Sequence, residues 1–284
     1  MNDIATSIEI DAASGWEASL ALSFASHSGR TVLERRAHRG PLVVQKALYP
    51  EGDSMCQSII VHPPAGIAGG DRLRLDVRVD ESARAQLITP GAAKWYRSAG
   101  ATAQQQLDFS VGPGALLEWL PQESIVFDGA IADLQTGIAL EGDAVFLGWD
   151  IVCLGRRLAG ERWTHGRLKH EIVLRRDGAR TWMERAAFGG GSKLLDARVG
   201  LDGATVYGTF LASAVRVSDD LIGACRAIEC DDGEVAVSRL PGVMLARYRG
   251  DSAEAARSYL AAIWACARPA LAGREAVRPR IWNT

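Results

Sequence analysis

The stretch that decides the fold lies at residues 62–73 and reads His62-Pro63-Pro64-Ala65-Gly66-Ile67-Ala68-Gly69-Gly70-Asp71-Arg72-Leu73. An apolar run at 58–61 leads into it, and the two prolines end that run as a strand because they cannot donate backbone hydrogen bonds. The glycines allow positive φ angles and a close approach to another surface. Apolar and charged residues then alternate over 73–79, which predicts a half-buried strand. We therefore expect two strands joined by a rigid crossing that places the Asp71 carboxylate at the start of a strand.

Strand-like runs recur outward from this stretch, separated by Gly, Pro or Asp. They lie at 20–24, 41–48, 85–88, 104–110, 115–120, 134–140, 144–154, 168–175, 181–187 and 205–212. Only two segments have helical spacing: 219–228, and a C-terminal segment from Asp251 to Pro269 in which Glu254 completes a capping box. This pattern predicts a mainly β protein of hairpins or stacked sheets. We expect a many-stranded, sheet-rich single domain over 1–284, with a C-terminal helix and one further short helix.

Charge and cysteine content narrow the class of protein. A formal net charge of −2 gives no bulk attraction to nucleic acid or to anionic membranes. The N-terminus lacks an apolar signal segment, and the apolar run at 144–154 is too short to span a bilayer, so we expect a cytoplasmic protein. The five cysteines form no C-x-x-C pair and indicate buried thiols in a reducing compartment, Cys153 and Cys266 most plainly.

Several carboxylates fall inside apolar runs. Glu118 would share a strand face with two leucines, and Asp150 and Glu184 occupy similar positions in later strands, while Glu123 and Asp128 follow soon after Glu118. A buried carboxylate must be paired, protonated or bound to a cation. One interpretation is a buried salt bridge for each acid, with Arg156 and Arg157 as candidate partners of Asp150. The other is that the acids together line an interior passage, whose oxygen ligands would hold a divalent ion loosely enough for transfer.

Motifs of common enzymes are missing. The chain has no phosphate-binding loop, no nucleophile elbow and no dinucleotide fingerprint, and His170-Glu171 lacks the second histidine of a zinc protease. One enzyme class stays open, a glycosidase in which Glu118 or Glu184 is the acid and Asp150 its counterpart. Such an enzyme requires both carboxyl groups in one open cleft, about 5–10 Å apart.

Taken together, the motifs resemble the urease accessory protein UreD family, also called UreH. The likeness follows the family's order from near residue 15 to the end of the chain. The motifs that carry it are Arg39-Gly40-Pro41-Leu42 with Tyr49-Pro50-Glu51, His62-Pro63-Pro64 through Gly69-Gly70-Asp71, Pro90-Gly91-Ala92-Ala93-Lys94-Trp95-Tyr96-Arg97-Ser98, Leu117-Glu118-Trp119-Leu120-Pro121-Gln122-Glu123, Trp149-Asp150 with Cys153-Leu154-Gly155-Arg156, and Pro279-Arg280-Ile281-Trp282.

The resemblance implies a non-enzymatic, mainly β maturation factor. Such a protein would bind UreF, and with it UreG, and the hetero-oligomer would dock on the urease apoprotein subunits. It implies no tightly bound cofactor, only a nickel ion in transit, and neither nucleic-acid nor membrane binding. By motif, Asp71, Asp150 and Glu184 fall where the family places the carboxylates of a nickel passage.

Departures from the family pattern distinguish among these acids. Arg72 follows Asp71 where some relatives carry an acid, and its positive charge would weaken the local field, which favours Asp150 over Asp71 as a metal contact. A third class of function also stays open at this point. In it the protein is only a protein-binding β module, and every inward acid is a structural ion pair.

Overall fold

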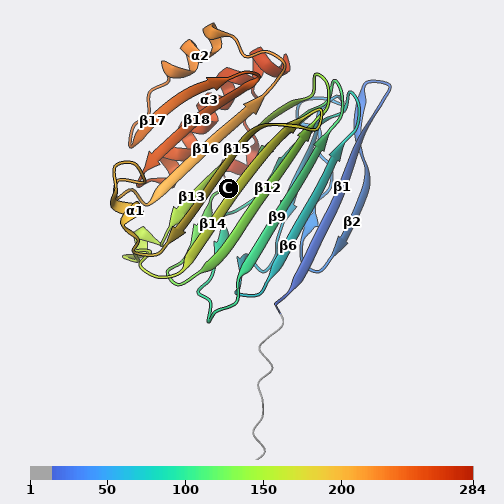
Figure 1. Ribbon diagram of the computed structural model, residues 1–284. Helices are drawn as coiled ribbons and strands as arrows, with labels where there is room; N and C mark the ends of the chain where they lie inside the picture. The colour runs from blue at the N-terminus through green and yellow to red at the C-terminus, as the bar shows by residue number, and fades with distance from the viewer. Residues whose placement is uncertain (1–14, 284) are drawn as a thin grey trace, which may run out of the picture.

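The computed structural model describes residues 15–283 and contains two β-sheets stacked face to face (Figure 1). The seven-stranded sheet has the order β15 (Ala179–Gly189), β14 (Arg167–Arg176), β12 (Ile131–Leu140), β9 (Ala103–Val111), β6 (Arg72–Val79), β1 (Glu17–His27) and β2 (Arg30–Arg39). The 11-stranded sheet has the main order β17 (Glu234–Leu240), β18 (Val243–Gly250), β16 (Val206–Ser213), β13 (Val145–Leu154), β10 (Leu116–Leu120), β7 (Arg84–Ile88), β4 (Cys56–Val61) and β3 (Val43–Val44). Three short strands extend the larger sheet near β13: β5 (Gly66–Ile67), β8 (Ala93–Trp95) and β11 (Ser124–Val126). The expectation of a mainly β fold is confirmed.

Through its middle, the chain alternates between the two sheets. Strands β4, β7, β10 and β13 lie side by side in the larger sheet, whereas β6, β9, β12 and β14 lie side by side in the smaller one. Neighbours within each of these sets are parallel. A parallel pair needs a crossover connection, and here the intervening strand of the opposite sheet provides it in place of a helix. Stacked sheets are thus confirmed, and within residues 15–283 hairpins such as β1–β2, β14–β15 and β17–β18 flank this run of parallel strands.

The glycines of the crossing act in the two ways that the sequence indicates. Gly70 has a φ of +97°, which other residues rarely adopt. Gly66 has an ordinary backbone conformation, but a Cβ atom there would lie 1.9 Å from a ring carbon of Tyr96. The close approach of backbone to ring therefore requires glycine at position 66.

Helices α2 (Asp219–Arg226) and α3 (Ala253–Ala272) cover the outer face of the larger sheet (Figure 1). The expected capping by Asp251 is wrong, because the Ser252 hydroxyl accepts the hydrogen bond from the Ala255 amide. The helix also continues past Pro269, which lies in its last turn and, having no N–H, leaves out the hydrogen bond to the carbonyl four residues earlier. Cys266 of the same helix is only partly buried, contrary to the expectation that it is among the most plainly buried thiols. The remaining helical elements are α1 (Lys193–Asp196), η1 (Arg157–Ala159) and η2 (Arg280–Asn283). None of the helices in the described part of the chain is both long and apolar enough to cross a membrane.

Two apolar cores result, one between the sheets and one between the larger sheet and its helices. The helix-side core holds three tryptophans that touch in series. The ring centroid of Trp282 lies 5.4 Å from that of Trp149 in β13 and 5.8 Å from that of Trp264 in α3. The C-terminal motif that ends in Trp282 therefore packs the end of the chain onto the sheet.

Some strands at or next to the edges of the sheets were not indicated by the sequence. Strands β17 and β18 were not expected, and neither was the edge strand β2, which contains the basic residues Arg35, Arg36 and His38. The side chains of these basic residues are exposed to solvent. Charged side chains on an edge strand also hinder unwanted pairing with other strands.

Candidate functional site

A group of polar side chains crosses the space between the sheets, at the end where β14 and β15 face β13, β16 and β18. We call it the inter-sheet polar row. Strand alternation directs these side chains inward from both sheets, among otherwise apolar neighbours. Its members are Asp150, His170, Glu184, Tyr207, Thr209 and Arg247.

His170 lies at the centre of one half of the row. Its Nε2 atom is 3.5 Å from Oδ2 of Asp150, and its Nδ1 atom is 3.3 Å from the hydroxyl of Tyr207. Burial raises the pKa of Tyr207 well above its usual value, and the charges of Glu184 and Asp150 raise it further. The phenol therefore stays protonated and can donate to the imidazole at physiological pH.

Arg247 organises the other half of the row. One guanidinium nitrogen donates to Oε2 of Glu184 at 2.5 Å, and the other lies 3.4 Å from Oγ1 of Thr209. Thr209 is in turn the cross-strand neighbour of Asp150. The two halves are therefore adjacent on the inner face of the larger sheet.

A cavity opens at each side of the row. The first, which we call the His62 cavity, has a volume of about 290 Å³ and is lined mainly by apolar residues, with His62, Lys94 and Asp150 among its polar ones. The second, the Glu184 cavity, has a volume of about 450 Å³ and includes Glu184, Tyr207 and Arg247 in its lining. Because Asp150 borders one cavity and Tyr207 the other, the row lies between them.

Asp71 is not a member of the row. Its two carboxylate oxygens accept hydrogen bonds from the backbone amides of Trp16 and Ala68, each at 2.8 Å. The bond from Ala68 is the local role that a carboxylate in a turn usually has, whereas the bond from Trp16 ties the segment before β1 to the crossing. Its charge still reaches His62, where it opposes the burial that lowers the pKa of the imidazole.

Two other acids are held in ion pairs, as the salt-bridge interpretation predicts. Glu118 faces the helix-side core, where Nε of Arg268 donates to its Oε1 at 2.7 Å and Nε2 of Gln86 donates to its Oε2 at 2.7 Å. Glu123 lies 3.3 Å from Nη1 of Arg257. Across residues 15–283, no three His, Cys, Asp or Glu side chains form a group that could hold a metal ion.

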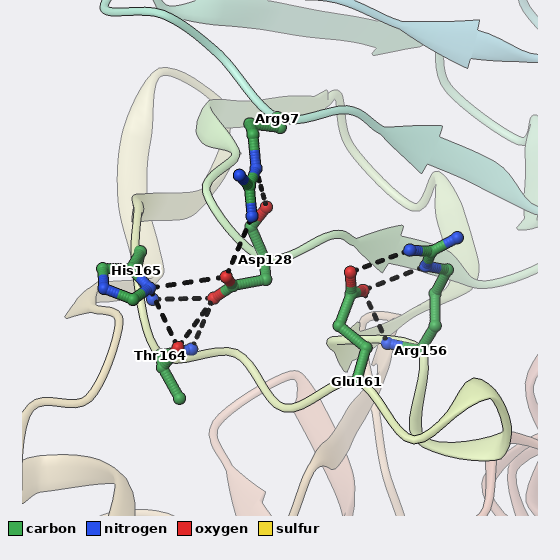
Figure 2. A network of polar contacts seen from close by, with 6 residues as sticks. All are labelled: Arg97, Asp128, Arg156, Glu161, Thr164 and His165. Carbon is green, nitrogen blue, oxygen red and sulfur yellow. Dashed lines mark hydrogen bonds and ion pairs between the residues drawn. The ribbon is translucent and has the colours of Figure 1, made fainter.

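Asp128 organises a loop rather than the interior (Figure 2). It accepts hydrogen bonds from the amides of Thr164 and His165, at 2.6 and 2.8 Å, and contacts the Arg97 guanidinium. Burial alone would raise the pKa of Asp128, but these hydrogen bonds hold it below its usual value.

The arginines expected beside Asp150 have other partners. The guanidinium of Arg156 binds Glu161, in the same loop region (Figure 2), and that of Arg157 lies 3.7 Å from Asp251. His170 takes their place beside Asp150. The sequence does contain a signal for this residue, since His170 alternates with Leu168 and Ile172 on the apolar face of its strand. Tyr207 and Arg247 gave no comparable signal.

The fold and the row together define a class of protein: a two-sheet β scaffold with a helical layer, and with a polar connection between two cavities. A family model described as "UreD urease accessory protein" matches residues 17–283. Proteins named "Urease accessory protein UreD" from Azoarcus sp. (strain BH72) and Dechloromonas aromatica (strain RCB) are each 52% identical to this chain, with 95% of both chains covered in each comparison. One of the same name from Methylobacillus flagellatus is 47% identical over the full length of both chains. The chain belongs to the UreD urease accessory protein family, and its role is that of a urease accessory protein.

Proposed function

We propose that this chain docks with UreF and UreG on apo-urease in the cytoplasm and passes nickel toward the urease active site. The observation that carries the passage is the placement of the inter-sheet polar row between two cavities. Nickel is the cargo of this process and not a resident cofactor.

The chemistry of the row suits brief contacts with a divalent cation. Asp150 and Glu184 supply carboxylate oxygens, and His170 supplies an imidazole, which is a good nickel ligand. Each of these groups already has a partner within the protein. Asp150 contacts His170, Glu184 contacts Arg247, and His170 also contacts Tyr207. A passing ion must compete with those partners, so it would be held weakly and released readily.

The geometry favours this role over a glycosidase. Glu118 points to the helix side of the larger sheet and is bound to Arg268, while Asp150 points to the space between the sheets. Asp150 and Glu184 border different cavities. No two of these acids therefore share the open cleft that glycoside hydrolysis needs.

The passage is tested by the double substitution Asp150→Asn with Glu184→Gln, which keeps the shape of both side chains. A matched control is Glu171→Gln, because Glu171 is the neighbour of His170 in β14 but bonds to Arg185. Each variant is co-expressed with the urease operon, and assembled complex is quantified by size-exclusion chromatography before nickel per urease is measured.

We expect the double variant to assemble normally and to deliver about 10-fold less nickel, the usual effect of removing groups that support a metal site. The control should deliver nickel at the wild-type rate. Normal nickel delivery by the double variant would overturn the passage and leave a protein-binding module whose inward acids are structural pairs.

Docking is tested separately. Leu158 and Val199 are almost fully exposed, and burial of such apolar side chains by a partner would stabilise a complex. We expect the isolated chain to aggregate and co-expression with UreF to give a stable hetero-oligomer. A chain that remains monomeric at high concentration and fails to capture UreF would contradict docking, whatever the result for nickel.

A further inference from the structure

Two polar side chains that line the His62 cavity make no hydrogen bond or ion pair within residues 15–283. They are His62 and Gln105. His62 follows β4, in which Ile60 faces the space between the sheets, and strand alternation brings His62 to the same side. Gln105 lies in β9 of the smaller sheet, on the same face as the inward-pointing Leu107. The two sheets therefore each direct one polar group with unused hydrogen-bonding capacity toward the cavity.

Both groups are neutral at physiological pH. Burial lowers the pKa of His62, and the negative charge of Asp71 opposes this effect only in part. The amide of Gln105 carries no charge. A neutral imidazole and an amide can each donate and accept a hydrogen bond. A molecule that pairs with both of them should therefore also be able to donate and to accept, without carrying a charge.

The charged residues of the cavity also favour a neutral ligand. Lys94 lies in β8 beside Trp95, which is buried in the inter-sheet core and pairs with Ile67. Because neighbouring residues of a strand point to opposite faces, the Lys94 ammonium points away from this core. The carboxylate of Asp150, at the cavity border, would repel an anion. An organic cation would have to compete with His170 for that carboxylate.

The rest of the lining suits an apolar body. Most of it consists of leucine, isoleucine, valine, proline and alanine residues. The volume of about 290 Å³ is roughly twice that of an engineered apolar cavity of about 150 Å³ that binds benzene. An apolar lining with a few convergent polar groups is typical of a small-molecule site. A single ring with one polar substituent would therefore fit.

We propose that the His62 cavity binds a small, uncharged molecule that carries an apolar ring or chain and a primary amide. The amide oxygen accepts a hydrogen bond from one of the two unpartnered groups, and the amide nitrogen donates to the other. The apolar part packs against Leu73, Leu75 and Leu107, which line the cavity from the smaller sheet. Binding requires neither nickel nor a partner protein, so it can be measured separately from the passage.

Four ligands that share one benzene ring test the chemical class: benzamide, benzoate, benzylamine and toluene. The full-length chain is kept at low micromolar concentration to limit aggregation, and saturation-transfer NMR measures each dissociation constant at neutral pH. We expect a value of about 0.1–1 mM for benzamide, which is reasonable for so small a ligand. Benzoate should bind about 10-fold more weakly, because Asp150 repels its carboxylate. Benzoate, benzylamine or toluene binding as tightly as benzamide would overturn the proposal.

Leucine substitutions test the two polar groups. Gln105→Leu removes the amide with little change in volume, and we expect it to weaken benzamide binding about 5-fold, the value of one hydrogen bond, while toluene binding is unchanged. Gln104→Leu is the matched control, because Gln104 is the neighbouring residue on the exposed face of β9, and it should bind both ligands as the wild type does. His62→Leu should have the same effect as Gln105→Leu and provides a second test if one variant does not fold.

Ala93→Leu tests the location of the site. Ala93 lines the cavity and lies on the same strand face as Trp95, so the larger side chain should occupy the space and abolish the binding of benzamide and toluene. Thermal melts verify that each variant is folded. Benzamide binding that persists in Ala93→Leu, or that neither Gln105→Leu nor His62→Leu weakens, would overturn the proposal.

Discussion

The imidazole of His170 and the carboxylate of Asp150 meet across the gap between the two sheets, with Nε2 3.5 Å from Oδ2. His170 belongs to β14 of the smaller sheet, and Asp150 belongs to β13 of the larger one. The contact holds the acid at the border of the His62 cavity. It thereby links the stacking of the sheets to the position of a candidate nickel ligand.

Replacing Tyr207 with Phe removes the hydroxyl that contacts His170 and preserves the packing of the ring. We expect the free energy of unfolding to fall by about 1 kcal/mol, the usual net value of one hydrogen bond. Because the pKa of Tyr207 is raised in the folded protein, its contribution to stability is complete below the unfolded pKa near 10 and is lost at higher pH. Urea unfolding at pH 7 and at pH 10.5 measures both effects. A variant as sensitive to alkaline pH as the wild type would contradict the assignment.

Breaking the Glu118–Arg268 pair should cost more than any change in the row. Both side chains are fully buried, and two hydrogen bonds join them. Burial lowers the pKa of Arg268, but the hydrogen bonds and charges of Glu51 and Glu118 outweigh that effect and raise it. Glu118→Gln leaves a buried guanidinium short of one counter-charge, so we expect a loss of about 3–5 kcal/mol in urea unfolding. The double variant Glu118→Gln with Arg268→Met should lose less than the sum of the single losses, and strict additivity would show that the two residues act independently.

Asp128 should contribute to stability in a pH-dependent way. Its pKa is lowered on folding, so its contribution is present above the unfolded value near 3.9 and is lost as the pH falls through the folded pKa. Asp128→Asn should lower the free energy of unfolding at pH 7 by about 1–3 kcal/mol and make its decline below pH 4 shallower. Acid titrations followed by circular dichroism measure this, with the exposed Glu81→Gln as the control. An unchanged acid profile would argue against the loop network of Figure 2.

Gly66→Ala tests the close approach in the crossing between β4 and β6. The added Cβ atom would lie 1.9 Å from the Tyr96 ring, which packs edge-on against Phe127. We expect a loss of about 1–3 kcal/mol, typical of overpacking. The second change Tyr96→Ala should remove part of this loss, because the clash disappears with the ring. A double variant whose loss equals the sum of the two single losses would show that the ring is not the obstacle.

Alternation of apolar and polar residues was enough to predict most strands and the direction in which their acids point. The run at 134–140 became β12, and Asp150 and Glu184 face inward as their strand positions indicate. Strand β17 was missed because most of its residues are exposed and leave little apolar signal. Periodicity reports burial, so it is weakest at an exposed edge.

The partners of those acids could not be predicted from local sequence. Glu184 is bound by Arg247, which is 63 positions away, and their strands belong to different sheets. Nearby arginines were the natural candidates for Asp150, yet His170 from the opposite sheet is its partner. A strand pattern identifies the residues that point into the core. Which residues of the opposite sheet they contact depends on how the two sheets are stacked.

The interleaving of strands between the sheets also has a consequence for biosynthesis. From β7 to β13, each newly made strand pairs with the strand that left the ribosome three strands earlier, so both sheets grow together and neither closes before the other. Partly synthesised chains must therefore carry two unfinished sheet edges at once, which are sites for misassociation with other chains. We expect a folding helper or an early-binding partner to matter most during translation of this segment.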